Sequence, residues 1–95
     1  MKAVWKDIVL AESAETVMLG KECYFPVAAV RMDLLKRNSR VRYCHAKGEG
    51  ECYDIVLEDK TLPDGAWIYP HPFWEAGEVR GMVSFAEVVE VKVEK

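Results

Sequence analysis

Short apolar runs bounded by turn residues recur along this chain, and they constrain its fold more than any other feature. Runs of this length, rich in valine, isoleucine, threonine and aromatic residues, are typical of strands. The runs cover residues 3–5, 8–10, 16–19, 22–25, 41–43, 52–57, 66–69, 81–85 and 88–93. They predict a mainly β fold of about seven to nine short antiparallel strands, arranged as a small, partly open barrel or a bent two-sheet sandwich. The first four runs, within residues 1–25, are expected to form two hairpins, and the last two runs are expected to pair with each other.

One stretch departs from this pattern and favours a helix. Pro26 suits the first turn of a helix, where its missing N–H has no partner to lose. Val27, Val30 and Leu34 then recur at the spacing of one helical face. Lys36 and Arg37 at the end would complement the negative pole of the helix. We therefore expect one short α-helix near residues 26–37.

Length and composition limit the class of protein. A chain of 95 residues predicts a single domain, residues 1–95. Its 51% hydrophobic and 31% charged residues are those of a globular protein, and a net charge of −3 argues against nucleic-acid binding. No apolar run approaches the roughly 18 residues of a membrane span. The N-terminal residues lack the apolar core of a signal peptide, so we expect a cytoplasmic protein that does not act at a membrane.

The three cysteines, Cys23, Cys44 and Cys52, are expected to be free thiols, because their number is odd and no Cys-x-x-Cys pair is present. No usual ligand spacing indicates a metal site, and no motif indicates a cofactor. A zinc site built from these cysteines and one histidine stays open as an alternative.

The segment from Arg40 to Tyr53 predicts a hairpin whose turn carries Lys47, Gly48 and Gly50. Glycines allow a ligand to approach the backbone closely, and a lysine suits a phosphate or carboxylate. A plain hairpin turn explains the same residues without any ligand. The Walker pattern for nucleotide phosphates is absent.

Two further features bear on chemistry. Trp67 and Tyr69 share one strand face beside a rigid Pro-His-Pro segment, where a planar ligand could rest. Cys44 is a candidate nucleophile, with Lys47 or His71 tuning it or accepting its proton. The acidic residues offer no closely spaced pair of carboxylates. Whether the chain is an enzyme therefore stays uncertain.

Several ordered motifs resemble one known family. They are Tyr24-Phe25-Pro26, Val30 to Leu35, Cys44-x-x-Lys47-Gly48, Tyr53-Asp54, Asp64-x-Ala66-Trp67-x-Tyr69-Pro70-x-Pro72 and a final glycine-led strand ending in Phe85. The chain thereby resembles, over almost its whole length, the small bacterial domain of unknown function 427, which has sometimes been labelled nucleotidyltransferase-like. The resemblance implies a compact, tent-like arrangement of bent sheets with one short helix, and it implies no activity. Here His45 replaces the proline that often follows the cysteine.

These observations lead to one leading hypothesis, a small-molecule-binding β domain with a cationic and aromatic pocket. The predicted ligand is anionic or planar. The expected ligand-binding residues are Tyr24, Arg31, Cys44, Lys47, Gly48, Tyr53, Trp67 and Tyr69. Two alternatives remain: a cysteine-dependent enzyme using Cys44, and a homodimeric interaction domain joined through an edge strand such as 88–94.

Overall fold

Tight hairpins build the first part of the chain. The computed structural model describes residues 1–93. Strands β1 (Lys2–Trp5) and β2 (Ile8–Glu12) pair through Lys6 and Asp7, whose φ angles of 52° and 64° are both positive. Two positive φ angles in a two-residue loop make the turn whose twist matches that of paired strands. The predicted first hairpin is confirmed.

A second hairpin follows, also as predicted. Strands β3 (Val17–Leu19) and β4 (Glu22–Tyr24) pair across a turn at Gly20, where φ is 65°. Glycine adopts this backbone conformation without the steric cost that a side chain would add.

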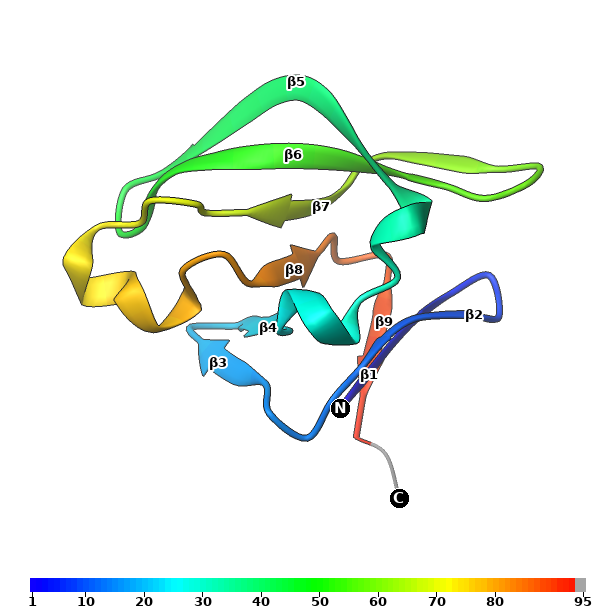
Figure 1. Ribbon diagram of the computed structural model, residues 1–95, viewed down its shortest axis with the longest axis horizontal. Helices are drawn as coiled ribbons and strands as arrows, with labels where there is room; N and C mark the ends of the chain where they lie inside the picture. The colour runs from blue at the N-terminus through cyan, green and yellow to red at the C-terminus, as the bar shows by residue number, and fades with distance from the viewer. Residues whose placement is uncertain (94–95) are drawn as a thin grey trace.

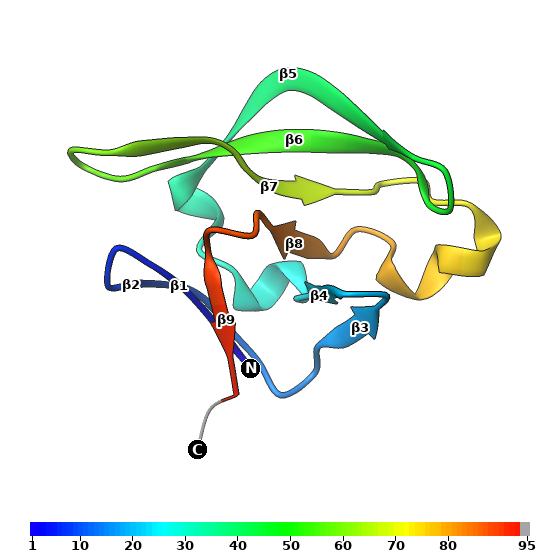
Figure 2. The same ribbon diagram turned by 180° about the vertical axis from the view of Figure 1, so that it is seen from behind.

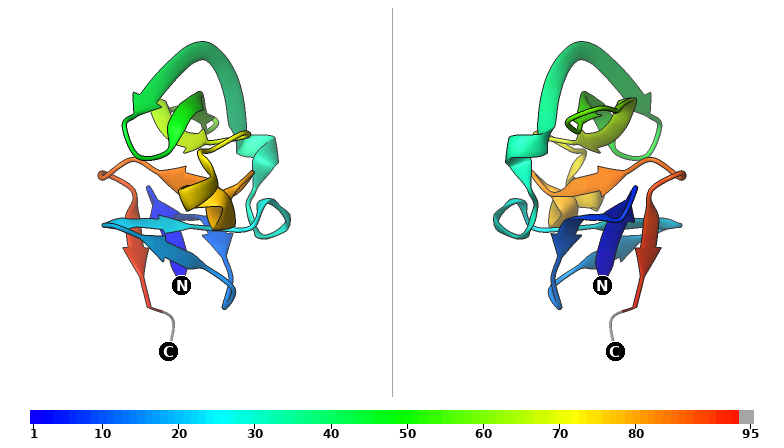
Figure 3. Two further views of the ribbon diagram at one scale, coloured as in Figure 1. Left: turned by 90° about the vertical axis from the view of Figure 1, so that its left-hand side faces the viewer. Right: turned by 90° about the vertical axis from the view of Figure 1, so that its right-hand side faces the viewer.

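The largest sheet contains four strands in the order β5-β6-β7-β8. Their bounds are Leu35–Cys44, Gly48–Val56, Thr61–Ile68 and Val83–Phe85. Strand β5 bends sharply at its middle and gives this layer the profile of a tent (Figure 1). Viewed from the side, the β5–β6 hairpin stands on one side of β8, and the two smaller sheets lie on the other (Figure 3).

Two bulges bend this sheet. On β5, residues 38–40 stand opposite Cys52 alone, because Arg37 pairs with Tyr53 and Val41 pairs with Glu51. On β7, residues 63–65 stand opposite Asp54 alone, since Ala66 pairs with Tyr53 and Leu62 with Ile55. Extra residues in one strand increase its local bend and twist. Residues 63–65, whose proline and Asp-Gly pair favour a bend in the sequence, are this second bulge inside β7.

The predicted α-helix near residues 26–37 is wrong. The segment instead forms two short 3-10 turns, η1 (Val27–Ala29) and η2 (Met32–Leu34), and β5 begins at Leu35. Between the turns Val30 is extended and bridges Ala11 of β2, while the Arg31 N–H donates to the Leu10 carbonyl at 2.7 Å. These bonds to a distant strand replace the bonds that a continuous helix would make.

The predicted pairing of the last two runs is also wrong. Strand β8 pairs with β7, and β9 (Glu90–Lys92) pairs with β1, which gives a three-stranded sheet in the order β2-β1-β9. The rear view shows β9 beside β1 (Figure 2). The free side of β8 is bridged by Phe25, which exchanges two backbone hydrogen bonds with Val83 at 2.8 and 2.9 Å. This bridge joins the four-stranded sheet to the β3–β4 hairpin.

The nine strands of the described chain thus form three antiparallel sheets without a closed barrel, so the mainly β prediction is confirmed. The principal core lies between the sheets, where Phe25 and Phe85 meet edge to face with ring centroids 5.7 Å apart. A second core gathers beneath β7 and the 3-10 segment η3 (Trp74–Val79); its buried members are Tyr24, Trp67, Tyr69, Ala76 and Val79. No helix within residues 1–93 has the length and apolar character needed to cross a membrane.

Candidate functional site

The turn between β5 and β6 directs Lys47 into the molecule rather than toward solvent. The Lys47 N–H donates to the Cys44 carbonyl at 3.1 Å, and the Lys47 carbonyl accepts from the Phe73 N–H at 3.0 Å. Gly48 follows with φ at 98°, and a Cβ there would lie 3.4 Å from the Phe73 ring. The turn is therefore fixed against the 70–73 segment, and only 12% of the Lys47 side chain is exposed.

The carboxylate of Glu22 lies where three side chains converge on it. Its Oε1 accepts from Lys47 Nζ at 2.9 Å and from the Tyr24 hydroxyl at 2.5 Å, while its Oε2 lies 4.0 Å from Arg42 Nη2. Charged donors and acceptors make shorter and stronger hydrogen bonds than neutral ones. Glu22, Tyr24, Arg42, Lys47, Trp67 and Tyr69 together are called the Lys47 cluster below.

Both cations of the Lys47 cluster also lie against aromatic rings. The Arg42 guanidinium carbon is 3.8 Å from the centroid of the Trp67 ring, and Lys47 Nζ is 5.7 and 5.8 Å from the centroids of Tyr24 and Tyr69. Cations within about 6 Å of a ring centroid are attracted to the negative face of the ring. The positive charges of Arg42 and Lys47 are therefore stabilised both by aromatic rings and by the Glu22 carboxylate.

These contacts shift two pKa values in opposite directions. Burial acts to raise the pKa of Glu22, but hydrogen bonds from Tyr24 and Lys47 and the charges of Lys47 and Arg42 outweigh it, so that pKa is lowered. Burial raises the pKa of Tyr24 strongly, and the hydrogen bond to Glu22 and its negative charge add to the shift. Near neutral pH the cluster thus contains a carboxylate and a protonated phenol.

Two polar atoms of the cluster have no hydrogen-bond partner. In the described part of the chain, the buried side-chain nitrogens and oxygens without one are Trp67 Nε1 and Tyr69 Oη. Trp67 Nε1 faces the Tyr24 hydroxyl and Tyr69 Oη faces Arg42, but neither contact reaches hydrogen-bond geometry. A buried unpaired donor costs about 1–3 kcal/mol, so such atoms need a structural or functional reason.

A cleft of about 540 Å³ adjoins the Lys47 cluster. It opens between the β3–β4 hairpin, the N-terminus and the segment from β8 to β9. It is lined by Met1, Met18, Lys21, Glu22, Cys23, Trp67, Ser84, Phe85, Ala86, Glu87, Val89 and Val91. Two of these residues, Glu22 and Trp67, also belong to the Lys47 cluster, so they form the wall between cleft and cations.

The structure brings together some of the expected ligand-binding residues. Tyr24, Lys47, Trp67 and Tyr69 meet in the Lys47 cluster; Cys44 packs against the same core, and Gly48 shapes the Lys47 turn. These residues come from β4, the β5–β6 turn and the end of β7.

Two expected residues lie elsewhere. Arg31 precedes β5 whereas Lys47 follows it, so the long strand separates them, and the Arg31 guanidinium pairs with Asp33 at 2.8 Å on the surface. Tyr53 packs against the principal core with Arg37 6.0 Å from its ring centroid. Cys52 pairs with Trp67 across β6 and β7, so Tyr53, one residue on, points to the opposite face.

Sequence reasoning missed Glu22 and Arg42. Glu22 precedes Tyr24 by two residues on β4, and Arg42 precedes Cys44 by two on β5, so each shares a strand face with a residue that was expected at the site. Period-two alternation was the available signal. In the sequence, neither residue belongs to a motif that marks a site.

The described structure adds no contact in support of the two hypotheses that involve cysteine, catalysis by Cys44 and a zinc site. Within residues 1–93, no hydrogen bond joins the half-buried Cys44 to His71 or to the Lys47 amine, and His71 is exposed. In the same residues, no three His, Cys, Asp or Glu side chains gather in a way that could hold a metal ion. Catalysis by Cys44 stays a hypothesis.

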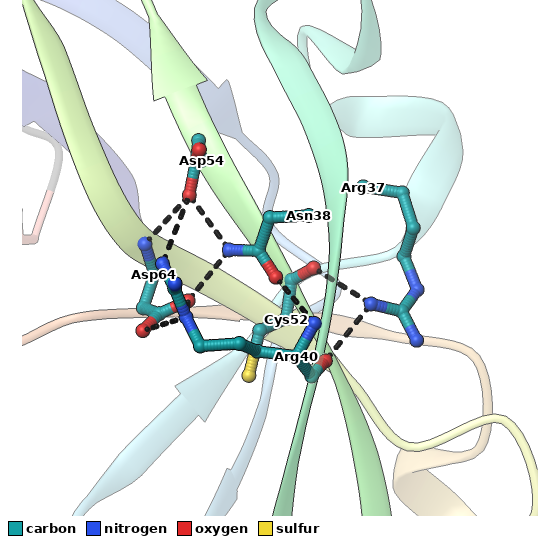
Figure 4. Close-up of polar contacts among 6 residues, drawn as sticks. All are labelled: Arg37, Asn38, Arg40, Cys52, Asp54 and Asp64. Carbon is teal, nitrogen blue, oxygen red and sulfur yellow. Dashed lines mark hydrogen bonds and ion pairs between the residues drawn. The ribbon is translucent and has the colours of Figure 1, made fainter.

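A second polar cluster joins the two bulges (Figure 4). Asn38 Nδ2 donates to Asp54 Oδ1 at 2.7 Å and to Asp64 Oδ1 at 2.6 Å, and the Asp64 N–H donates to Asp54 Oδ1 at 3.0 Å. Arg40 Nε reaches both Asp64 oxygens, at 3.0 and 2.9 Å. The bulges thereby bring two aspartates that lie ten residues apart in the sequence to the same Asn38 amide.

Contacts that stabilise the bend of the sheet account for this aspartate pair. Each carboxylate already accepts hydrogen bonds from the amide or guanidinium beside it, and the Asn38 hydrogen bond, the largest contribution, lowers the pKa of Asp54. Arg37 spans the β5 bulge by donating to the Arg40 carbonyl at 2.9 Å and the Cys52 carbonyl at 3.3 Å. The five side chains hold the bend of the sheet.

The fold and the site together describe a small, mainly β domain whose sheets meet over a cluster of cations, rings and one carboxylate. A family model described as a domain of unknown function, DUF427, matches residues 1–95, and the chain belongs to that family. No curated protein matches the chain.

Proposed function

We propose that this chain binds a small organic molecule in the cleft beside the Lys47 cluster. The observation that carries the proposal is the position of Trp67, which lines the cleft and also stacks under Arg42, with its indole N–H buried and unpaired. Ligand sites combine a mostly apolar concave surface with a few convergent polar groups. The cleft and the adjoining cluster have both properties.

The cleft suits a planar, mostly apolar ligand. Its volume of about 540 Å³ lies within the roughly 300–1,000 Å³ of small-molecule sites. Cys23, Trp67, Phe85 and Val89 are buried residues in its lining, and rings or aliphatic groups resting on them would be shielded from water. The flat indole of Trp67 favours an aromatic ring.

A titration with 2-naphthoate and its neutral analogue 2-naphthamide tests the proposal. We expect one or both to move the Trp67 indole N–H signal in a ¹H–¹⁵N NMR spectrum, with that signal assigned from Trp67→Phe. Ala86 lines the cleft, so Ala86→Phe should fill it and abolish the shift. Ala28→Phe adds the same volume at an exposed position outside the cleft and should leave binding unchanged.

The proposal fails if neither compound moves the Trp67 signal at concentrations up to their solubility. It also fails if Ala86→Phe and Ala28→Phe bind equally well, because the ligand would then occupy another surface.

A further inference from the structure

We propose that Glu22 occupies a carboxylate-binding site in the free chain, and that an aromatic carboxylic acid takes its place on binding. This inference deepens the proposed function and depends on the same cleft. It assigns the ligand class, a ring for the cleft with a carboxylate for the Lys47 cluster.

The groups around Glu22 form a recognition site for two carboxylate oxygens. One oxygen accepts from Lys47 Nζ and the Tyr24 hydroxyl, and the other faces the Arg42 guanidinium. Each donor is fixed by its own packing: Lys47 by its turn, Arg42 on the Trp67 ring, and Tyr24 in the second core. Donors held in place before binding recognise a carboxylate at a lower entropic cost.

The unpaired polar atoms show that Glu22 satisfies this site incompletely. Tyr69 is fully buried and Trp67 is 7% exposed, yet Tyr69 Oη and Trp67 Nε1 both lack an acceptor. Both face members of the Lys47 cluster. Glu22 is attached to β4, and its two oxygens are already used by Tyr24, Lys47 and Arg42. A free ligand can bring its carboxylate and further acceptors to positions that this tethered side chain does not reach.

The position of Glu22 provides a route for exchange. Its side chain is 27% exposed and lines the cleft, whereas the Lys47 amine lies behind it. Glu22 sits next to the turn of a hairpin whose strands have three residues each. Rotation of this one side chain toward solvent would open the wall between the cleft and the two cations.

Chemical rescue tests the carboxylate site separately from the cleft. Glu22→Ala leaves Lys47 without its counter-ion and should lower Tm in sodium chloride. Sodium acetate at equal ionic strength should raise the Tm of Glu22→Ala by about 4 °C more than that of the wild type, the shift expected at about five times the dissociation constant of acetate. Inorganic phosphate, which is tetrahedral, should rescue less.

The matched control is Asp33→Ala, which removes the partner of Arg31 from an exposed ion pair at 2.8 Å. Acetate should stabilise Asp33→Ala no more than the wild type, because no enclosing donors surround Arg31. Equal acetate effects on wild type, Glu22→Ala and Asp33→Ala would overturn the carboxylate site, as would equal rescue by phosphate.

Glu22→Gln provides a second variant of nearly unchanged shape. Its neutral amide competes less well for Lys47, so acetate should again stabilise it more than the wild type. Where Glu22→Ala is unfolded in chloride, refolding in acetate, followed by circular dichroism, counts as rescue. No acetate effect on either variant beyond that on the wild type overturns the inference.

The two naphthalene probes separate this inference from the proposed function. With both correct, Glu22→Ala should bind 2-naphthoate at least tenfold more tightly than the wild type does, and 2-naphthamide should gain nothing. Acetate rescue without any naphthoate binding supports the carboxylate site and refutes the cleft. Naphthamide binding that Ala86→Phe blocks, without acetate rescue, supports the cleft and refutes the carboxylate site.

Discussion

Gly50 allows the Tyr69 ring to lie directly against β6. We therefore predict that Gly50→Ala, the smallest substitution at this position, lowers the free energy of unfolding measurably. Gly50 is buried and pairs with Arg42 across β5 and β6. A Cβ at Gly50 would lie 2.9 Å from Tyr69 Cε1, and 3.1 Å from both Tyr69 Cδ1 and Arg42 Cγ. Carbon atoms in contact prefer about 3.5–4.0 Å, so the ring must move by about half an ångström or more.

The loss of unfolding free energy in Gly50→Ala depends on how little the Tyr69 ring can move. Tyr69 is fully buried among Tyr24, Trp67 and Val79, and overpacking at such a site costs about 1–3 kcal/mol. Alanine also restricts the unfolded chain, which returns about 0.4–1 kcal/mol. Gly50→Ala should therefore lose about 1–2 kcal/mol of unfolding free energy, and Tm should fall by about 10 °C.

Thermal unfolding followed by circular dichroism measures this effect, and Gly77→Ala is the control. A Cβ at Gly77 meets nothing within 4 Å, and the φ angle of Gly77 is not positive, so this variant should match or slightly exceed the wild type in Tm. Adding Tyr69→Leu to Gly50→Ala removes the clashing ring edge and should make the two changes less than additive. A Gly50→Ala variant as stable as Gly77→Ala would refute the reasoning.

Three further predictions concern the polar groups. Asn38→Asp places a third carboxylate beside Asp54 and Asp64, so urea unfolding should show a loss of stability at pH 7 that shrinks toward about pH 4, where the new carboxyl group regains a proton; Asn38→Ala should show no such recovery. The raised pKa of Tyr24 means that the folded chain keeps the phenol protonated where the unfolded chain ionises. Stability present below about pH 10 should therefore be lost as the pH rises above it, and Tyr24→Phe should lose less; equal losses would contradict this. Burial raises the pKa of the Cys23 and Cys52 thiols, so iodoacetamide should label Cys44 before either of them. Mass spectrometry of the labelled peptides gives the order of labelling. Labelling of Cys44 faster than a free thiol would favour the enzyme hypothesis, whereas earlier labelling of Cys23 or Cys52 would contradict the burial argument.

The hairpins were predictable from the sequence because their signals are local. Turn residues such as Gly20 and Gly48 lie between runs that pair with their nearest neighbours. The segment from Val27 to Leu34 was not, because its conformation depends on hydrogen bonds to β2, which lies about twenty residues earlier. The helical spacing of Val27, Val30 and Leu34 does not mark one buried face, because Val27 is exposed and the other two are half-buried.

The Lys47 cluster was predictable in part for a similar reason. Lys47, Trp67 and Tyr69 stood out through turn chemistry and aromatic character, and strand alternation places the two rings on one face. Tyr53 lies apart from the Lys47 cluster because Cys52, and not Tyr53, pairs with Trp67 across β6 and β7. Glu22 shares a strand face with Tyr24, but this alternation alone does not single it out, because its contacts are with Lys47 and Arg42, which come from another hairpin.

The bulge in β5 has a consequence for how copies of this chain meet. Strand β5 ends the order of its sheet, and an open strand of ten residues is a template on which another chain can add by backbone pairing. At Ser39 the backbone turns to a φ of 69°, and the charged Arg37 and Arg40 flank that point. A straight incoming strand would lose register there and meet positive charge. The bulge that bends the sheet therefore also protects its edge strand against fibrous self-association.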